Sequence, residues 1–231
     1  MADPARTAGG VVAAPLGALA RLRRGKPMHP RGAVLDAVLE RRGSRPEWGV
    51  PWLDELGSEP VIVRFSRGAG LPSAVPDLLG LAVRLPEGPI DLLLSTTGRG
   101  PLLRWVPLPR RDAAAVYTSI MGYRSDAGTL RFAALPEDDA LPSDPEDVAA
   151  AVRERSRLFT LAAARGPGRW RPFGRLVLTR PREPLDPDVR FDAVQHPPPG
   201  LAADGPMARF RAPAYARARA ERTTERLTRR G

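Results

Sequence analysis

Proline and glycine interrupt this chain along its whole length. The 231 residues include 27 prolines and 22 glycines, and these crowd the connections between the apolar segments. Proline lacks a backbone donor and glycine tolerates turn conformations, so such clusters mark the ends of strands and helices. No internal repeat is visible. The residues between these interruptions therefore define the regular elements that the chain can form.

Apolar residues alternate with polar ones in several of these segments, which predicts strands. The clearest strand is 60–66, and further strands are expected at 33–40, 79–85, 90–96, 128–135, 170–179 and 188–193. Helices are expected at 14–24, 111–123, 144–164 and from Pro213 onward. The third helix starts with Asp144-Pro145-Glu146-Asp147, which has proline in the first turn and acids at the positive end. Two sets of strands separated by helices fit an α+β fold, an antiparallel β-barrel with inserted and C-terminal helices.

Composition agrees with one globular domain. Apolar residues make up 42% of the chain and charged residues 27%, and the length is sufficient for a full core. The chain has no cysteine, which excludes disulfides, zinc-thiolate sites, iron–sulfur clusters and thiol catalysis. No apolar run approaches the roughly 18 residues of a membrane span. Residues 8–20 are too broken by glycine and proline for a signal peptide, so we expect a cytoplasmic protein with no membrane partner.

The chain is strongly basic, with a formal net charge of +10 and a pI of about 11.2. A basic balance can indicate a nucleic-acid binder. Here the charge is spread along the chain, and the densest arginine cluster, between 217 and 230, is interleaved with Glu221 and Glu225. Aromatic residues are only 6% and form no stacking series beside the basic runs. We therefore expect no nucleic-acid partner.

Three residues near the C-terminus are spaced to share one side of a helix. Arg211, Tyr215 and Arg222 stand at i, i+4 and i+11. A guanidinium one turn from a tyrosine favours the phenolate form, which can ligate iron, and tyrosinate is one of the axial ligands of haem. Arg222 could hold a carboxylate of the bound group. The alternative is that Tyr215 is one half-buried aromatic residue in a solvated basic helix.

Five blocks of the chain, in the same order, resemble motifs of the haem catalases. The blocks are Met28-His29-Pro30-Arg31-Gly32, Val61 to Ser66, Pro76 to Arg84, Ile90 to Leu93, and Pro199-Gly200-Leu201 followed by Met207 and Arg211 to Tyr215. Together they span about residues 26–222. The resemblance implies a catalase-like barrel domain over 25–231 after an N-terminal arm over 1–24. It also implies that the long wrapping segments and the C-terminal helical domain of larger catalases are absent.

The same resemblance assigns roles around a haem b cofactor. His29 would be the distal base, since the pKa of histidine lies near neutrality, and Ser66 would fix its tautomer. Tyr215 would bind the haem iron, with Arg211 beside it. The haem propionates would be held by Lys26, Arg64 and Arg222. His196, in a proline-rich loop, is expected to be structural.

One departure from the family bears on the activity. Thr96 stands where catalases carry the asparagine that polarises the bound peroxide, and a hydroxyl is a shorter and less constrained donor. Losing a preorganised donor costs about 10²–10³ in rate. The resemblance therefore implies a slow peroxidase or weak catalase that acts on hydrogen peroxide or organic hydroperoxides with a small-molecule reductant. The alternative is a haem-free catalase-fold binding or scaffold protein, and the oligomeric state is left open.

Overall fold

The structure is a computed structural model, and it describes residues 29–205. The expected arm over 1–24, the helix at 14–24 and the helix from Pro213 onward lie outside the described residues. The proposed domain bounds therefore stay predictions.

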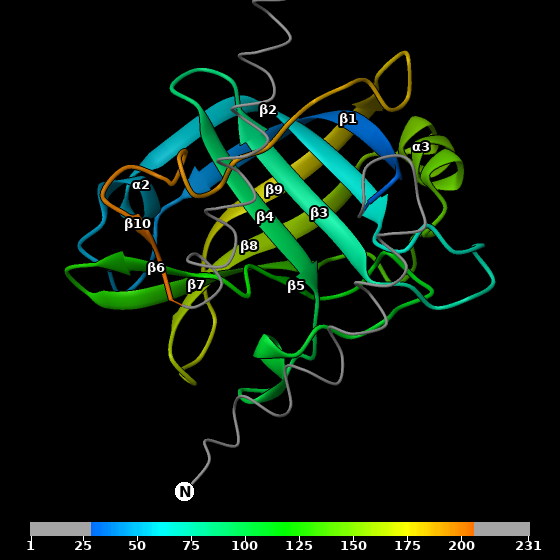
Figure 1. The fold of residues 1–231 in the computed structure, drawn as a ribbon. Coiled ribbons are helices and arrows are strands. Elements are labelled where there is room, and N and C mark those ends of the chain that lie inside the picture. Colours follow the sequence, from blue (N-terminus) through cyan, green and yellow to red (C-terminus); the bar gives the residue numbers. More distant parts are fainter. Residues whose placement is uncertain (1–28, 206–231) are drawn as a thin grey trace, which may run out of the picture.

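Eight strands form a closed antiparallel barrel (Figure 1). Every neighbouring pair around the barrel is antiparallel. In spatial order the strands are β7 (Gly128–Pro136), β5 (Tyr117–Thr118), β4 (Ile90–Thr96), β3 (Leu79–Leu85), β2 (Leu56–Arg67), β1 (Arg31–Arg42), β9 (Arg171–Pro181) and β8 (Arg157–Arg165), which pairs again with β7. Two short strands, β6 (Gly122–Ser125) and β10 (Ala202–Asp204), extend the sheet from β7.

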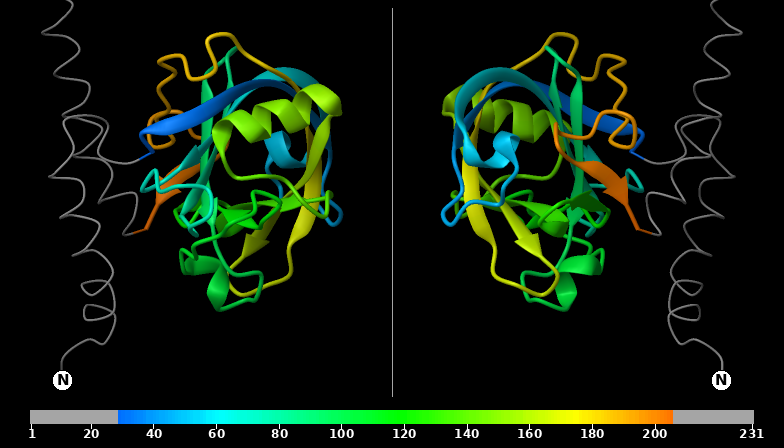
Figure 2. Two further views of the ribbon diagram at one scale, coloured as in Figure 1. Left: turned by 90° about the vertical axis from the view of Figure 1, so that its right-hand side faces the viewer. Right: turned by 90° about the vertical axis from the view of Figure 1, so that its left-hand side faces the viewer.

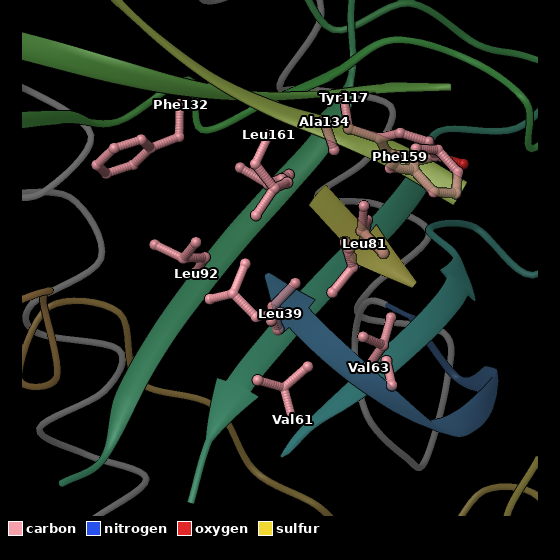
Figure 3. Close-up of a cluster of buried hydrophobic side chains, with 14 of the residues drawn as sticks. Leu39, Val61, Val63, Leu81, Leu92, Tyr117, Phe132, Ala134, Phe159 and Leu161 are labelled. Carbon is pink, nitrogen blue, oxygen red and sulfur yellow. The ribbon is translucent and has the colours of Figure 1, made fainter. Parts of the chain in front are cut away.

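Alternation along each strand separates the interior of the barrel from its outer wall. In β1, Leu35 and Leu39 are fully buried in the core, whereas Asp36 and Glu40 point the other way and are partly exposed. Aliphatic and aromatic side chains fill the interior (Figure 3): Leu39, Val61, Val63, Leu81, Leu92, Tyr117, Phe132, Ala134, Phe159 and Leu161. Because the interior is packed with side chains, the barrel encloses a core and not a channel.

Two helices lie at opposite ends of the barrel (Figures 1 and 2). In α2 (Pro51–Asp54), Trp52 packs against the rings of Phe132 and Phe173, at centroid distances of 6.0 and 5.4 Å. At the other end, α3 (Pro145–Glu154) is capped by Asp144, whose carboxylate accepts from the Glu146 amide at 3.2 Å. Within the described residues no helix is long and apolar enough to span a membrane.

Three sequence-based expectations were wrong. The segment 111–123 is not a helix but an irregular chain that contains β5, because Tyr117 and Thr118 pair with both β4 and β7 to complete the barrel. The helix expected at 144–164 ends at Glu154. The alanine-rich remainder is β8, which pairs on both edges, so tertiary pairing overrides alanine's helix propensity. The strand expected at 188–193 is a loop.

The other expected strands are confirmed. The strands predicted at 79–85 and 90–96 coincide with β3 and β4. The runs at 33–40, 60–66, 128–135 and 170–179 lie within β1, β2, β7 and β9, apart from one residue at the start of the last. Helices are fewer than an α+β class implies: α2, α3 and a short 3₁₀ turn, η1 (Leu103–Trp105), are those of residues 29–205.

Asp138 links the end of β7 to the start of β8 and supports a pH prediction. Its carboxylate lies 2.5 Å from Arg155 and accepts from the Leu158 amide at 3.1 Å. Burial alone would raise its pKa, but these two partners lower the pKa below 3.8. The ionised form therefore contributes stability that is present above about pH 4 and is lost as the pH falls through the lowered pKa of the folded state.

We expect Asp138→Asn to lower the free energy of unfolding by about 1–3 kcal/mol at pH 7. The difference from the parent protein should shrink as urea unfolding is repeated at pH values falling from 4 through the lowered pKa of folded Asp138, because the carboxylate is then progressively protonated in the folded state as well. Asp139→Asn is the matched control, since the neighbouring Asp139 is exposed. A pH-independent difference would contradict the assignment.

Candidate functional site

His29 precedes β1 and is fixed through both its backbone and its ring. It has a positive φ of 58°, unusual for a residue with a side chain. Its amide donates to the carbonyl of Gly68 at 2.9 Å, and its Nδ1 lies 2.8 Å from Oγ of Ser66 in β2. The structure thus brings together two of the residues that the sequence selected. A ring fixed at Nδ1 has a defined orientation for Nε2, which is what proton transfer requires.

Glycines on the neighbouring strands make room for this ring. Ser66 pairs with Gly32 of β1 on one side and with Gly80 of β3 on the other. A Cβ atom on Gly80 would lie 2.7 Å from Cε1 of His29 and 2.8 Å from Oγ of Ser66. The His29–Ser66 pair therefore sits over a position on the outer wall where no side chain other than glycine's fits.

Arg64 lies one step from Ser66 on the same face of β2. Its Nε and Nη2 donate to the two carboxylate oxygens of Asp186 at 2.7 and 2.9 Å, and Nη2 also donates to the carbonyl of His29 at 3.2 Å. A Cβ on Gly32 would lie 2.6 Å from the guanidinium carbon, so this glycine too makes space. Nη1 makes no hydrogen bond to any residue within 29–205. Arg64 is therefore a positioning residue for His29 whose charge is largely balanced by Asp186.

Thr96 is fully buried, and both functions of its hydroxyl are used. The oxygen accepts from the Leu79 amide at 3.1 Å, and the hydroxyl donates its single proton to the Leu108 carbonyl at 2.8 Å. A donor role toward a ligand would require the Leu108 bond to break. In this structure Thr96 ties β4 to β3 and to the following loop.

Ser95 is the hydroxyl on the His29 face that the sequence reasoning did not select. Its partner across the ladder is Gly80, so in the row Gly32–Ser66–Gly80–Ser95 the side chains share one face. Ser95 is partly exposed, and its side chain makes no hydrogen bond within the described residues. The alternation of β4 could have identified it, but three consecutive leucines, 92 to 94, hide which residues face inward.

The next row of the outer wall holds three apolar side chains and Arg64. Val34 pairs with Arg64, which pairs with Ala82, which pairs with Leu93. Val34 is fully buried and Ala82 is 9% exposed, although both lie outside the barrel core. The apolar side chains of this row are therefore largely covered, and Leu93 is the one that is partly exposed.

His196 has a structural role, as the sequence predicted. Its Nδ1 lies 2.9 Å from the carboxylate of Asp91, which is completely buried and also accepts two hydrogen bonds from Arg84 at 2.7 and 2.6 Å. The Asp91 amide donates to the His196 carbonyl at 2.8 Å. This cluster fastens the loop after β9 to the outer wall of β3 and β4.

The expected proximal residues lie outside the described part of the chain. These are Lys26, Arg211, Tyr215 and Arg222, so a Tyr215 oxygen facing the His29 ring stays a prediction. Tyr117 is fully buried and donates to the Ala113 carbonyl at 2.9 Å, and its pKa is raised far above the usual value by burial and then by the charge of Asp112. Tyr117 is therefore unsuited to be a phenolate ligand. Residues 29–205 contain no group of three or more histidine or carboxylate side chains that could hold a metal ion.

The fold is similar to that of solved catalases. Catalase A from Saccharomyces cerevisiae aligns with a TM-score of 0.62 and 14% sequence identity, over 90% of this chain and 63% of that one. A second fungal catalase aligns with a TM-score of 0.56 and 14% identity, over 82% and 58%. The chain thus spans less than two thirds of the length of either. No protein-family profile and no curated protein matches the sequence. The fold of this chain is therefore catalase-like.

Gly80→Ala tests whether the His29–Ser66 pair depends on the space above Gly80. The added methyl group would overlap the ring and the hydroxyl, so we expect a loss of about 1–3 kcal/mol in the free energy of unfolding, as for other overpacked sites. The His29 ring signals in NMR spectra should shift as well. Gly100→Ala is the control, because a Cβ there meets nothing within 4 Å. Unchanged His29 signals in Gly80→Ala would contradict the packing argument.

Proposed function

We propose that this protein binds haem b and cleaves peroxides, as a slow peroxidase or weak catalase. The observation that carries the proposal is the His29–Ser66 pair, held over Gly80 on the outer wall of a catalase-like barrel. A histidine oriented by a hydroxyl is a general acid–base group. The proposed setting is the cytoplasm, with a peroxide and a small-molecule reductant as partners.

The described residues that could contact a cofactor lie on this wall. Val34 and Ala82 are apolar but buried, so the partly exposed groups beside Gly80 are the His29 ring and Ser95. Arg64 retains one guanidinium nitrogen, Nη1, without a partner within 29–205, and this nitrogen could donate to a propionate. Lys26, Arg211 and Arg222 would supply further cations, and Tyr215 the iron ligand, from the segments outside the described residues.

His29 would carry the proton transfer. With Nδ1 donating to Ser66, Nε2 has the lone pair, so it can take a proton from one peroxide oxygen and return it to the other. Haem iron, when bound, supplies the electrons that break the oxygen–oxygen bond. Ser66 keeps the ring in the required tautomer, and Arg64 fixes the His29 carbonyl. Each of these residues acts on the position or the protonation of one ring.

Ser95 would be the second polar group toward the peroxide. It faces the same side as Ser66 across Gly80, whereas the proton of Thr96 is donated to Leu108. A serine hydroxyl is short and rotates, so it stabilises developing charge less well than a preorganised donor. This weak donor supports slow cleavage in preference to fast dismutation, with hydrogen peroxide or organic hydroperoxides as substrates.

A haem-free binding or scaffold protein is the second candidate. The observation in its favour is the Arg64–Asp186 pair, in which a carboxylate from the chain itself takes most of a cation that a propionate would otherwise use. Against it, the glycines and the His29–Ser66 contact serve no evident need of the barrel core.

Hemin titration of the purified full chain distinguishes the two candidates. We expect a Soret band that saturates at one haem per chain and that shifts in Tyr215→Phe, because the phenolate ligand is lost. Tyr123→Phe is the control, since Tyr123 is completely buried in the barrel core. Absence of saturable uptake, or a spectrum equally affected in both variants, would favour the haem-free protein.

Two further substitutions test the distal roles. We expect Ser95→Ala to lower the rate of peroxide consumption by roughly tenfold while hemin affinity and folding stay unchanged, because one weak donor is removed. Thr96→Ala should instead destabilise the fold by about 1–3 kcal/mol, since the Leu79 amide and the Leu108 carbonyl lose their partner. Stopped-flow assays and urea unfolding separate these effects. Equal rates in Ser95→Ala and the parent would remove Ser95 from the site.

A further inference from the structure

A rigid loop at one end of the molecule exposes large apolar side chains to solvent. The loop 98–108, which contains η1, protrudes at the bottom of Figures 1 and 2. Leu102 is 72% exposed, Leu103 52% and Val106 44%. We call these three residues the apolar tip. They are three of the five large apolar side chains that stand clearly exposed in the described part of the chain.

The loop that carries the apolar tip is held firmly by the barrel. Arg104 is 3% exposed, donates to the carbonyls of Gly166 and Gly168 at 3.3 and 2.8 Å, and stacks on the Trp170 ring at 4.4 Å. Its own carbonyl accepts from Thr118 at 2.7 Å. Leu102 and Leu103, just before the buried Arg104, and Val106, two residues after it, are therefore exposed on a backbone that this anchor holds.

Three arginines that form no ion pair within 29–205 lie on the loop of the apolar tip and on the turn beside it, and one of them, Arg165, donates to the Ala127 carbonyl at 3.1 Å. Arg99 belongs to the loop itself, and Arg165 and Arg169 belong to the β8–β9 turn that Arg104 holds beside it. All three are exposed, and none forms an ion pair with a residue within 29–205. Neither 98–108 nor 165–171 contains an aspartate or a glutamate. The end of the molecule thus combines exposed aliphatic groups with uncompensated positive charge.

We propose that the apolar tip docks on the surface of an anionic phospholipid bilayer. Aliphatic side chains enter the boundary between headgroups and acyl chains, while surrounding arginines pair with lipid phosphates. The uncompensated charge opposes docking of a second copy of the same basic surface, and a nucleic acid offers no apolar phase for two leucines. The expectation of no membrane partner rested on the lack of an apolar run long enough to span a bilayer, but a surface contact requires no span. This inference is independent of haem binding.

Vesicle sedimentation of the full chain tests the proposal. We expect binding to vesicles that contain phosphatidylglycerol, much weaker binding to phosphatidylcholine alone, and a decline with added salt. The double variant Leu102→Ser/Leu103→Ser should bind the anionic vesicles at least about tenfold more weakly, because most of the apolar contact is removed. Leu56→Ser is the matched control, since Leu56 is 77% exposed elsewhere on the barrel and should leave binding unchanged.

Other outcomes would overturn the proposal. Unchanged vesicle binding in Leu102→Ser/Leu103→Ser would mean that another basic part of the chain, such as the arginines near the C-terminus, accounts for the attraction. Loss of a dimer in the double variant, seen by light scattering and without loss of vesicle binding, would identify a second copy as the occupant. Equal losses in the double variant and in Leu56→Ser would indicate unspecific adhesion. Circular dichroism spectra of all variants establish that they are folded.

Discussion

Pairing between β7 and β8 closes the barrel, and the location of the candidate functional residues within 29–205 follows from that closure. The ladder runs from Leu130 opposite Arg165 to Pro136 opposite Phe159 and completes the ring of eight strands. Closure leaves an interior that Phe132, Phe159 and their neighbours fill completely. A ligand cannot enter such an interior, so any site has to lie on the outer wall. Ser66 and Ser95 lie there because they occupy outward-facing positions of β2 and β4, and His29, just before β1, is held over them by its contacts with Gly68 and Ser66.

A buried ion pair connects this wall to the position of His29. Arg67 and Asp77 are almost completely buried, with 3.8 Å between the guanidinium and the carboxylate. Arg67 donates to the carbonyls of the loop between them, and Asp77 accepts from the amides of Ala69 and Leu71. These contacts hold the start of the loop, and its Gly68 carbonyl accepts the His29 amide. A buried ion pair adds little net stability, so its clearest contribution here is a defined backbone.

The sequence could predict those elements whose signal is local. The strands β3 and β4 are short apolar runs bounded by turn residues, so their bounds were predicted correctly, although the leucines of β4 do not show which side faces inward. By contrast, β5 and β8 are strands because other strands flank them, and no local pattern reports such pairing. The His29–Ser66 contact was accessible through resemblance to known motifs. Asp186, which lies 122 residues from its partner Arg64, has no local signal at all.

The glycines around Ser66 bear on whether the site is functional or inherited. Glycine inside a strand costs about 0.5–1 kcal/mol relative to alanine, and it contributes no side chain to the core. Gly32 and Gly80 flank Ser66 on the outer wall, where the barrel interior makes no demand on side-chain size. Each leaves space for one particular group, the Arg64 guanidinium or the His29 ring. At Gly32 an added Cβ would also lie 2.7 Å from the backbone carbonyl oxygen of Phe65, so the wall itself requires glycine there, whereas at Gly80 the close contacts are the side chains of His29 and Ser66. The unfavourable Gly80 is explained if the orientation of His29 matters more than the stability of β3, as the proposed proton-transfer role would require.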